Sequence, residues 1–306
     1  MRALVTGAAG FIGSNLVPEL LKLGHSVLVL DNFSNSSPEN LPSSPDITIC
    51  QGDVCVYEDV LAAVKQADVV FHMAAQVGNV LSMERPQTDL ITNVVGTINL
   101  LQACHEQNLK QMVYSSSSAI FGETQYIPVD EAHPKEPMSP YGLSKYAAER
   151  YCLILGAEYG LRIACLRYFN VYGALQHFNP YGNVLPIFAE KVLEGEPFTI
   201  YGDGEQTRDF IDVTDIVRAN VLAMQHEANG VFNIGTGVAT TVNQLAQSVI
   251  NAVEKDVEIK YAPPRSGEVR DSVATIAKAS KELDFHPSVS IDEGVRNYIA
   301  WFNSTN

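Results

Sequence analysis

The chain has 306 residues, of which 46% are hydrophobic and 18% charged, and its formal net charge is −15. This length suits one large domain with an added lobe, and such an acidic chain is a poor partner for nucleic acid or an anionic membrane. The five cysteines are odd in number and form no C-x-x-C pair, which predicts reduced thiols and a cytoplasmic location. No signal peptide is expected, because Gly7 and Gly10 interrupt the early apolar run, and no apolar stretch reaches the roughly 18 residues of a membrane span.

Short, uniformly apolar runs recur along the chain and are typical of buried strands. They lie at 3–5, 27–30, 47–49, 69–71, 112–114, 163–166 and 231–234. Helices are predicted between them over 14–23, 57–65, 89–107 and 213–225, with another from residue 140, and the polar stretch 32–46 is expected to be a loop. In the helix over 89–107, Val94, Ile98 and Leu101 form the predicted buried stripe. This alternation predicts an α/β fold, a Rossmann-type doubly wound parallel sheet covered on both faces.

The alternation of strands and helices ends after about residue 171, where glycine, proline and aromatic residues become denser, as at 179–182 and 262–265. A predicted helix and strand over 213–234 then return the chain to the sheet. We therefore expect a Rossmann domain formed by 1–170 plus 211–237. A smaller, discontinuous C-terminal lobe, formed by 171–210 plus 238–306, is expected to bind the substrate.

A glycine-rich segment, G-x-x-G-x-x-G, follows the first predicted strand and opens the first helix. Its glycines Gly7, Gly10 and Gly13 let the backbone approach a pyrophosphate, whose charge the helix N-terminus attracts. Asp31 ends the second strand, 18 residues after Gly13, where a carboxylate accepts hydrogen bonds from adenosine ribose hydroxyls and repels a 2′-phosphate. The pattern predicts NAD rather than NADP. Asp53, after the third strand, is either a partner of the adenine amino group or a turn residue.

Tyr141 and Lys145 are spaced i and i+4 on a helix predicted to begin near Pro140, so their side chains lie on one face. A tyrosine has a pKa of about 10 in water and is a poor base at neutral pH. A lysine ammonium one turn away favours the phenolate, so Lys145 is predicted to lower the pKa of Tyr141. The pair is then a candidate proton carrier. The alternative is a half-exposed tyrosine beside a solvated lysine.

Taken together, these motifs resemble the extended short-chain dehydrogenase/reductase family. The resemblance rests on the glycine segment, Asp31, Met73-Ala74-Ala75, Asn93, the serine run 115–118 and Tyr141-x-x-x-Lys145. It narrows to the nucleotide-sugar branch, and there to UDP-glucose and UDP-N-acetylglucosamine 4-epimerases, at segments 167–170 (RYFN), 201–209 (YGDGEQTRD), 233–237 (NIGTG) and 265–270 (RSGEVR). The match runs from residue 1 to about 285.

The resemblance implies which residues form the site. Tyr141 and Lys145 match the catalytic pair, and Ser117 matches the catalytic Ser/Thr, with Ser116 or Ser118 as alternative registers. NAD is the implied cofactor, held by Gly7, Gly10, Phe11, Ile12, Gly13, Asp31, Asn32, Asn35, Asp53, Val54, Met73, Ala74, Ala75, Asn93, Ser115, Tyr141, Lys145 and Tyr168. A UDP-sugar is the implied substrate, held by Ser117, Asn170, Asn183, Val184, Leu185, Tyr201, Arg208, Arg265, Glu268 and Ser272. Arg208 and Arg265 would clamp the diphosphate with their guanidinium forks, and no residue is assigned to a metal.

The implied activity is NAD-dependent epimerisation at C4 of a UDP-hexose, with dTDP as an open alternative to UDP. Tyr141, as phenolate, takes the proton of the sugar 4-hydroxyl, and Ser117 hydrogen-bonds the same oxygen. C4 gives its hydride to NAD, and the transient 4-keto sugar turns over and takes the hydride back on its other face. Relatives usually dimerise through helices equivalent to 89–107 and 140–159, so a homodimer is expected. Val94, Ile98, Leu101, Leu153 and Ile154 offer apolar surface for it unless the sheet covers them.

Three alternatives are weighed against this activity. Dehydratases and uronic acid decarboxylases of the family generally carry an acidic residue shortly after the catalytic Thr, where this chain has Ser118 and Ala119. Uronic acid 4-epimerases tend to carry Thr in place of Asn170 and Arg in place of His177, so both residues favour a neutral hexose. A non-catalytic NAD-binding regulator is the third alternative, but such members usually lose the Tyr/Lys pair.

Ser272 is expected to set which sugars fit. It lies seven residues after Arg265, the position that faces the sugar 2-substituent in the resembling epimerases. Relatives restricted to UDP-glucose and UDP-galactose often carry tyrosine there, whereas a serine leaves room for an acetamido group and offers it a hydroxyl. The enzyme is therefore expected to take UDP-N-acetylglucosamine as well as UDP-glucose. Alternatively, Ser272 only hydrogen-bonds its own backbone in a loop.

Overall fold

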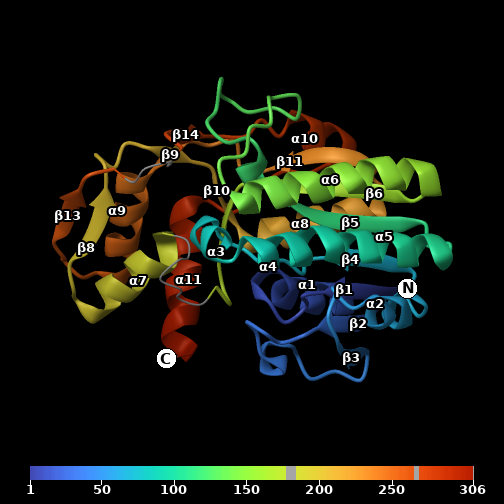
Figure 1. The fold of residues 1–306 in the computed structure, drawn as a ribbon. Helices are drawn as coiled ribbons and strands as arrows, with labels where there is room; N and C mark the ends of the chain where they lie inside the picture. The colour runs from blue at the N-terminus through green and yellow to red at the C-terminus, as the bar shows by residue number, and fades with distance from the viewer. Residues whose placement is uncertain (177–183, 265–268, 306) are drawn as a thin grey trace.

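The computed structural model describes residues 1–176, 184–264 and 269–305 (Figure 1). Its larger part is a seven-stranded parallel sheet with the strand order β11-β6-β5-β4-β1-β2-β3. The strands are β1 (Arg2–Thr6), β2 (Ser26–Asp31), β3 (Ile47–Gln51), β4 (Val69–His72), β5 (Gln111–Ser117), β6 (Arg162–Tyr168) and β11 (Gly230–Ile234). All seven apolar runs predicted as strands lie in this sheet, which confirms the predicted doubly wound α/β fold.

Both faces of the sheet are buried, because successive residues of a strand point to opposite faces and helices cover each of them. In β1, Ala3 and Val5 join one core layer and Leu4 joins the other. The first layer is packed by α1 (Phe11–Lys22), α8 (Val213–Gln225) and α10 (Ala277–Leu283). The second is packed by α2 (Tyr57–Val64), α5 (Gly96–Glu106) and α6 (Pro140–Tyr159). The central strands are therefore mostly apolar instead of alternating with polar residues, whereas the edge strand β3 leaves Thr48 and Ile49 exposed.

The single helix predicted over 89–107 is in fact three segments. Helix α4 (Pro86–Leu90) leads into a π-helical turn, η2 (Ile91–Val95), and α5 follows. A π-helical turn changes which residues face the core, since its hydrogen bonds span i to i+5. The predicted stripe residue Ile98 is consequently only half-buried, and Leu100 is buried in its place. The same turn holds the polar side chain of Asn93 in the interior.

The second lobe is built on α7 (Val184–Glu194), α9 (Val242–Val253) and α11 (Ile291–Thr305), with the parallel strand pair β8 (Phe198–Tyr201) and β13 (Ile259–Ala262). Two small sheets join it to the larger part: β7 (Asn170–Tyr172) with β10 (Phe210–Asp212), and β12 (Thr240–Thr241), β9 (Thr207–Arg208) and β14 (Asp271–Ser272). Figure 1 shows these sheets beside the lobe helices. Phe285 and the buried residues of α10, which the sequence assigned to the lobe, pack against the Rossmann core. The residue ranges of the two domains stay a prediction.

The order of the strands determines where a ligand can bind. The chain runs from β1 outward through β2 and β3, then returns to β4 on the other side of β1 and continues outward to β11. Open parallel sheets bind ligands at the carboxyl ends of the strands, at the point where this order reverses. The shorter elements η1 (Pro38–Asn40), α3 (Asn79–Glu84) and η3 (Ser118–Ile120) lie in the connections after β2, β4 and β5. Among the described residues, no helix has both the length and the hydropathy to cross a membrane.

Candidate active site

The glycine-rich segment turns from β1 into α1 directly against the residues that follow β4. A Cβ atom added to Gly7, which has φ +63°, would lie 2.7 Å from the Ala74 backbone. One added to Gly13 would lie 2.4 Å from the Gly7 carbonyl oxygen. Gly10 caps α1 without a side-chain hydrogen bond, and the first turn of a helix carries N–H groups that lack partners within the helix. The crevice at this reversal point therefore suits a pyrophosphate close to the backbone.

Asp31, at the end of β2, fastens the glycine turn to the sheet. Its Oδ2 accepts a hydrogen bond from the Ala9 N–H at 2.9 Å, and its Oδ1 accepts from the Phe33 N–H at 2.9 Å and the Ser36 hydroxyl at 3.2 Å. A carboxylate has about four acceptor positions. These three protein donors therefore leave about one position, on Oδ2, for a ribose hydroxyl.

The loop after β2 meets the end of β3 through Asn32, which donates from Nδ2 to Asp53 Oδ2 at 3.0 Å. Burial acts to raise the pKa of Asp53, but hydrogen bonds from the Cys55 N–H and Asn32 outweigh it and lower the pKa. Asn35 is exposed on the same loop, and Val54 is buried in the core. The predicted adenine-side residues thus gather at the carboxyl ends of β2 and β3.

Helix α6 brings the Tyr141–Lys145 pair to the end of β5. The Ser139 hydroxyl caps the first turn of this helix. Tyr141 shares a hydrogen bond with Ser117, the last residue of β5. Lys145 is buried, with Nζ 4.7 Å from the centre of the Tyr114 ring. The three residues predicted to be catalytic therefore converge at one strand end.

The pKa of Tyr141 in the protein is raised, contrary to the sequence-based expectation. Loss of solvation raises it to about 12, the hydrogen bond with Ser117 acts to lower it, and the charge of Asp89 adds to the rise. Burial lowers the pKa of Lys145 to about 8. The expectation considered only the charge of Lys145, but desolvation of the phenol outweighs that charge. A phenolate at neutral pH therefore requires further positive charge beside the ring.

The serines of the run 115–118 lie in different environments. Ser116 is buried and donates to Glu149 Oε2 at 2.7 Å, inside a buried ion pair between α6 and β6. Ser117 points the other way, as the alternation of a strand requires, and shares its hydrogen bond with Tyr141. Residue 118 already begins the 3-10 turn η3. Of the three registers left open by the sequence, the one that brings a serine to Tyr141 is Ser117.

Asn93 links the segment after β4 to α6. Its Oδ1 accepts from the Gln76 N–H at 2.8 Å, and its Nδ2 lies 3.0 Å from the Gln76 carbonyl oxygen, from Asp89 Oδ1 and from Ser144 Oγ. Every one of these contacts is buried. Asn93 therefore holds the edge of the crevice in place from inside the protein, and its amide is engaged by protein groups.

Tyr168 and Ser115 lie at the ends of the neighbouring strands β6 and β5. The Tyr168 hydroxyl donates to Asn220 Oδ1 at 2.9 Å, lies 3.9 Å from the Met73 sulfur and also interacts with Ser115. Burial raises the pKa of Tyr168 well above its usual value. Tyr168 is therefore a neutral side chain at the end of β6, in contact with Met73 and Ser115.

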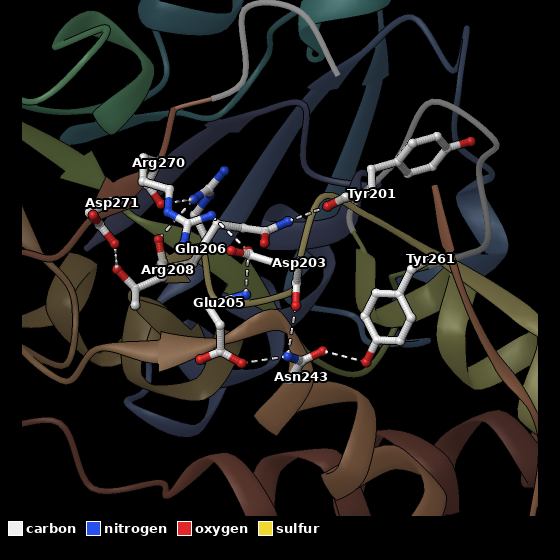
Figure 2. Close-up of polar contacts among 10 residues, drawn as sticks. Tyr201, Asp203, Glu205, Gln206, Arg208, Asn243, Tyr261, Arg270 and Asp271 are labelled. Carbon is white, nitrogen blue, oxygen red and sulfur yellow. Dashed lines mark hydrogen bonds and ion pairs between the residues drawn. The ribbon is translucent and has the colours of Figure 1, made fainter. Parts of the chain in front are cut away.

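On the lobe side, Arg208 lies in β9, within the group of polar side chains shown in Figure 2. Its Nη1 donates to the carbonyl oxygens of Thr207 at 2.8 Å and Arg270 at 3.2 Å. The register of β9 and β14 pairs Arg208 with Ser272. The predicted diphosphate clamp and the predicted sugar-selecting residue are therefore direct neighbours across two strands.

A second arginine, Arg270, was not predicted as a site residue. Figure 2 shows it beside Arg208, where it forms a bidentate pair with Asp203 at 2.8 and 3.1 Å. The hydrogen bond from Arg270 is the largest of the effects that lower the pKa of Asp203 to about 2. Both residues lie in quoted motifs, but they are 67 residues apart. Only the pairing of β9 with β14 reveals that they meet.

The remaining predicted substrate residues are spread over the start of the lobe. Asn170 begins β7, and its N–H donates to the Asp209 carbonyl oxygen at 2.9 Å. Val184 and Leu185 begin α7, where the Leu185 side chain is buried in the lobe core, so its backbone is the part that a ligand can meet. Tyr201 ends β8 and is partly exposed (Figure 2). Three residues predicted to bind the substrate lie outside the described residues, namely Asn183, Arg265 and Glu268, and so does His177.

The fold and the crevice together define a dinucleotide-dependent enzyme with a Tyr–Lys pair at the end of a central strand. The chain belongs to the NAD dependent epimerase/dehydratase family, whose model matches residues 3–235, and its cofactor is NAD. The glycine turn, which has no room for added Cβ atoms, and the Asp31 carboxylate fit that cofactor.

Relatives match the chain along almost its whole length. The UDP-glucose 4-epimerase of Mycolicibacterium smegmatis is 37% identical over 99% of each chain. The crystal structure of UDP-glucose 4-epimerase from Thermotoga maritima with UDP-glucose has 41% identity and a TM-score of 0.95, covering 100% of this chain and 99% of that one. The structure of UDP-N-acetylglucosamine 4-epimerase from Methanobrevibacter ruminantium in complex with UDP-N-acetylmuramic acid has 36% identity and a TM-score of 0.96, with the same coverage.

Proposed function

We propose that this protein interconverts UDP-hexoses by inverting C4, acting on UDP-glucose and UDP-galactose and on UDP-N-acetylglucosamine and UDP-N-acetylgalactosamine. The observation that carries the proposal is the contact between Ser117 and Tyr141, with Lys145 one turn further along α6. This group lies at the carboxyl end of β5, beside the crevice that suits NAD. Oxidising and re-forming an alcohol requires a group that removes and returns the hydroxyl proton at this point.

Each side chain of this group has a separate role in the proposed reaction. When bound, NAD supplies the acceptor and donor for the hydrogen at C4. Tyr141 takes the proton of the sugar 4-hydroxyl and returns it to the same oxygen after inversion. Ser117 hydrogen-bonds that oxygen, and its contact with Tyr141 already acts to lower the phenol pKa. Lys145 contributes a buried positive charge that favours the phenolate.

The nucleotide would be held from the lobe side. Arg208, with Arg265 as its proposed partner, offers guanidinium donors to the diphosphate. The structures similar to this chain from T. maritima and M. ruminantium hold UDP-sugars, which supports a UDP-sugar substrate. The second of these complexes contains an N-acetylated sugar, which supports a site with room for an acetamido group beside Ser272.

The alternative of a dehydratase or decarboxylase has little support around Ser117. A 5,6-elimination needs an acid/base group next to the catalytic hydroxyl, but the next two residues are Ser118 and Ala119. The Ala119 carbonyl oxygen packs so closely on α6 that a Cβ added to Gly142 would lie 2.4 Å from it. No acid/base side chain follows Ser117 directly, and we propose that the 4-keto sugar is an intermediate and not the product.

We also propose that a second copy of the chain packs on the outer face of α6. Leu143, Tyr151 and Ile154 form an apolar stripe on this helix at helical spacing and are all exposed. Val94 and Leu101, predicted to contribute, are instead buried, and Leu101 packs in the second core layer of the sheet. The exposed stripe supports a homodimer, since exposed apolar patches mark interaction sites.

The proposed chemistry is tested with Tyr141→Phe, which keeps the ring and removes the proton-carrying oxygen. We expect kcat to fall on the order of 10³-fold, while NAD and UDP bind as in the wild type. Conversion of UDP-glucose to UDP-galactose measures the first effect and calorimetry the second. Tyr126→Phe, at an exposed tyrosine, is the control and should keep full activity. Substantial epimerisation by Tyr141→Phe would overturn the assigned role.

A further inference from the structure

Asp89 is a buried acid beside the Tyr141–Lys145 pair that none of the sequence motifs singled out. It lies on α4, directly before the π-helical turn, and is 1% exposed. Its Oδ1 accepts a hydrogen bond from Asn93 Nδ2 at 3.0 Å. Its Oδ2 is buried and has no hydrogen-bond partner among the described residues. A buried carboxylate is costly unless charge or hydrogen bonds compensate it, so this position calls for an explanation.

Counting hydrogens shows that Asp89 belongs to a network that reaches α6. The Asn93 amide nitrogen has two hydrogens but three acceptors at 3.0 Å, namely the Gln76 carbonyl, Asp89 Oδ1 and Ser144 Oγ. The Ser144 hydroxyl donates to the Tyr141 carbonyl oxygen at 3.0 Å, and Ser144 also acts to lower the pKa of Asp89. Asp89, Asn93 and Ser144 therefore act as one unit. This unit joins the segment after β4 to the turn of α6 that carries Tyr141 and Lys145.

The charges around Lys145 leave Asp89 as its balancing anion. The titratable and charged groups that face the Lys145 ammonium are His72 on β4, Tyr114 on β5, Cys165 on β6, Cys152 and Glu149 on α6, and Asp89 on α4. Desolvation lowers the pKa of His72 to about 3, and it raises the pKa of Tyr114 and of Cys165 well above neutrality. These groups therefore carry no charge at pH 7. Cys152 shares a hydrogen bond with Cys165.

Glu149 does carry a charge, but that charge is already matched. Its two oxygens receive Arg167 Nη2 at 2.7 Å and Nε at 2.9 Å, and both side chains are buried. Among the described groups that face Lys145, Asp89 is then the acid without a cation in direct contact. Burial raises the pKa of Asp89 and lowers that of Lys145, and each charge opposes the shift of the other group, as opposite charges in a poorly solvated interior must.

We propose that Asp89 is a positioning residue for the Tyr141–Lys145 pair: its carboxylate is the counter-charge of the Lys145 ammonium and, through Asn93 and Ser144, holds the first turns of α6 against the segment after β4. The inference deepens the proposed epimerase and rests on it only where activity is measured. The proposed role of Asp89 also explains why the π-helical turn places polar groups in the interior, because that turn directs Asn93 toward Asp89 and Ser144.

The first test titrates Lys145 itself, in purified protein with NAD bound. Asp89→Asn keeps the shape of the side chain and one oxygen for Asn93 but removes the charge. We expect the pKa of Lys145 to fall by about one unit, measured by carbon NMR of lysine-labelled protein, with Lys145→Met identifying the resonance. Asp46→Asn removes the same charge from an exposed loop and should leave the titration unchanged. An unchanged Lys145 pKa in folded Asp89→Asn would overturn the proposal. If the Asn variant does not fold, the Lys145 pKa is measured in Asp89→Leu instead, with the same expected fall.

The second test is the pH profile of kcat. Removing a negative charge makes Lys145 lose its proton more readily and makes the Tyr141 phenolate easier to form, so both pKa values fall. Both limbs of the profile should therefore move to lower pH in Asp89→Asn. A one-unit fall in the Lys145 pKa lowers its protonated fraction at pH 8 about five-fold, and kcat should fall by the same factor where Tyr141 is already fully ionised. Asp89→Glu retains the charge and should keep the wild-type limbs. Lower activity with unmoved limbs would mean a purely structural role and would contradict the proposal. If the wild type does not epimerise UDP-sugars, the proposed function fails, while the NMR titration still decides on Asp89.

Discussion

At the scale of single residues, solvation has more influence on the reactive groups than their spacing in the sequence. Tyr141 and Lys145 are placed as a helix requires, but desolvation moves their pKa values apart, to about 12 and about 8. Each shift favours the uncharged form, as burial always does. The base is therefore protonated in the protein alone, and it becomes available only when positive charge enters the crevice.

A prediction at this scale concerns Ser272. Because Ser272 pairs with Arg208 across β14 and β9, its side chain is fixed relative to the proposed diphosphate clamp. Ser272→Tyr should lower kcat/KM for UDP-N-acetylglucosamine on the order of 100-fold, since a rigid ring overlaps the acetamido group, and should leave UDP-glucose turnover nearly unchanged. Both substrates are assayed with the same enzyme preparation.

The control for this prediction is Ser272→Ala, which removes the hydroxyl without filling space. It should keep activity on both substrates to within a few-fold, because a single neutral hydrogen bond contributes about 1 kcal/mol. Equal losses on both sugars in Ser272→Tyr would show that residue 272 does not select the substrate.

At the scale of elements, the segments that connect strands and helices form the crevice. The turn from β1 into α1 passes so close to the segment after β4 that no side chain fits at Gly7. The π-helical turn η2 plays a comparable part on the other side, because it places the Asn93 amide between two elements. These connecting segments allow backbone N–H groups and buried polar side chains to face a ligand from rigid secondary structure.

The prediction at this scale is that Gly13→Ala abolishes NAD binding. The added methyl group would lie 2.4 Å from the Gly7 carbonyl oxygen and 2.6 Å from Ala8 Cα, so the turn must open. A fluorescence titration with NAD measures the loss. Gly24→Ala is the matched control, since a Cβ there meets nothing within 4 Å although φ is +78°. It should cost about 1 kcal/mol of stability and keep NAD affinity, whereas near wild-type affinity in Gly13→Ala would refute the proposed cradle.

At the scale of the whole molecule, the layers determine which surfaces remain for a partner. The inner faces of α5 and α6 pack in the second core layer of the sheet, so only the outer faces of these helices are available to a partner. Ile91 and Val95 on η2 are exposed, and η2 packs beside α6. Their apolar surface thus extends the stripe formed by Leu143, Tyr151 and Ile154.

The corresponding prediction is that Ile154→Glu converts a dimer into a monomer. Two copies of one face meet around a two-fold axis, so each substitution would bury two carboxylates in an apolar contact, which is strongly unfavourable. Light scattering coupled to size-exclusion chromatography measures the mass. Leu23→Glu, at an exposed leucine beyond the end of α1, should leave the mass unchanged. A wild-type protein that is monomeric at micromolar concentration would contradict the proposed homodimer.

The sequence by itself determined the features that depend on local chemistry. Apolar runs identified all seven strands, because a parallel sheet buried on both faces requires them. The glycines and Asp31 identified the cofactor crevice, because close backbone approach and a ribose-binding carboxylate need those residue types. The Tyr141–Lys145 spacing followed from the helical repeat.

Only the tertiary structure decided the features that depend on solvation and on contacts between distant segments. The rise in the pKa of Tyr141 comes from the atoms packed around the phenol, which spacing along the chain does not report. The pair between Asp203 and Arg270 joins residues 67 positions apart through strand pairing. Asp89 lacks a motif of its own, and it became visible only when burial left one of its oxygens without a partner. Charge and hydrogen bonding in an interior depend on every element packed around a group, so they are settled when the whole chain is folded.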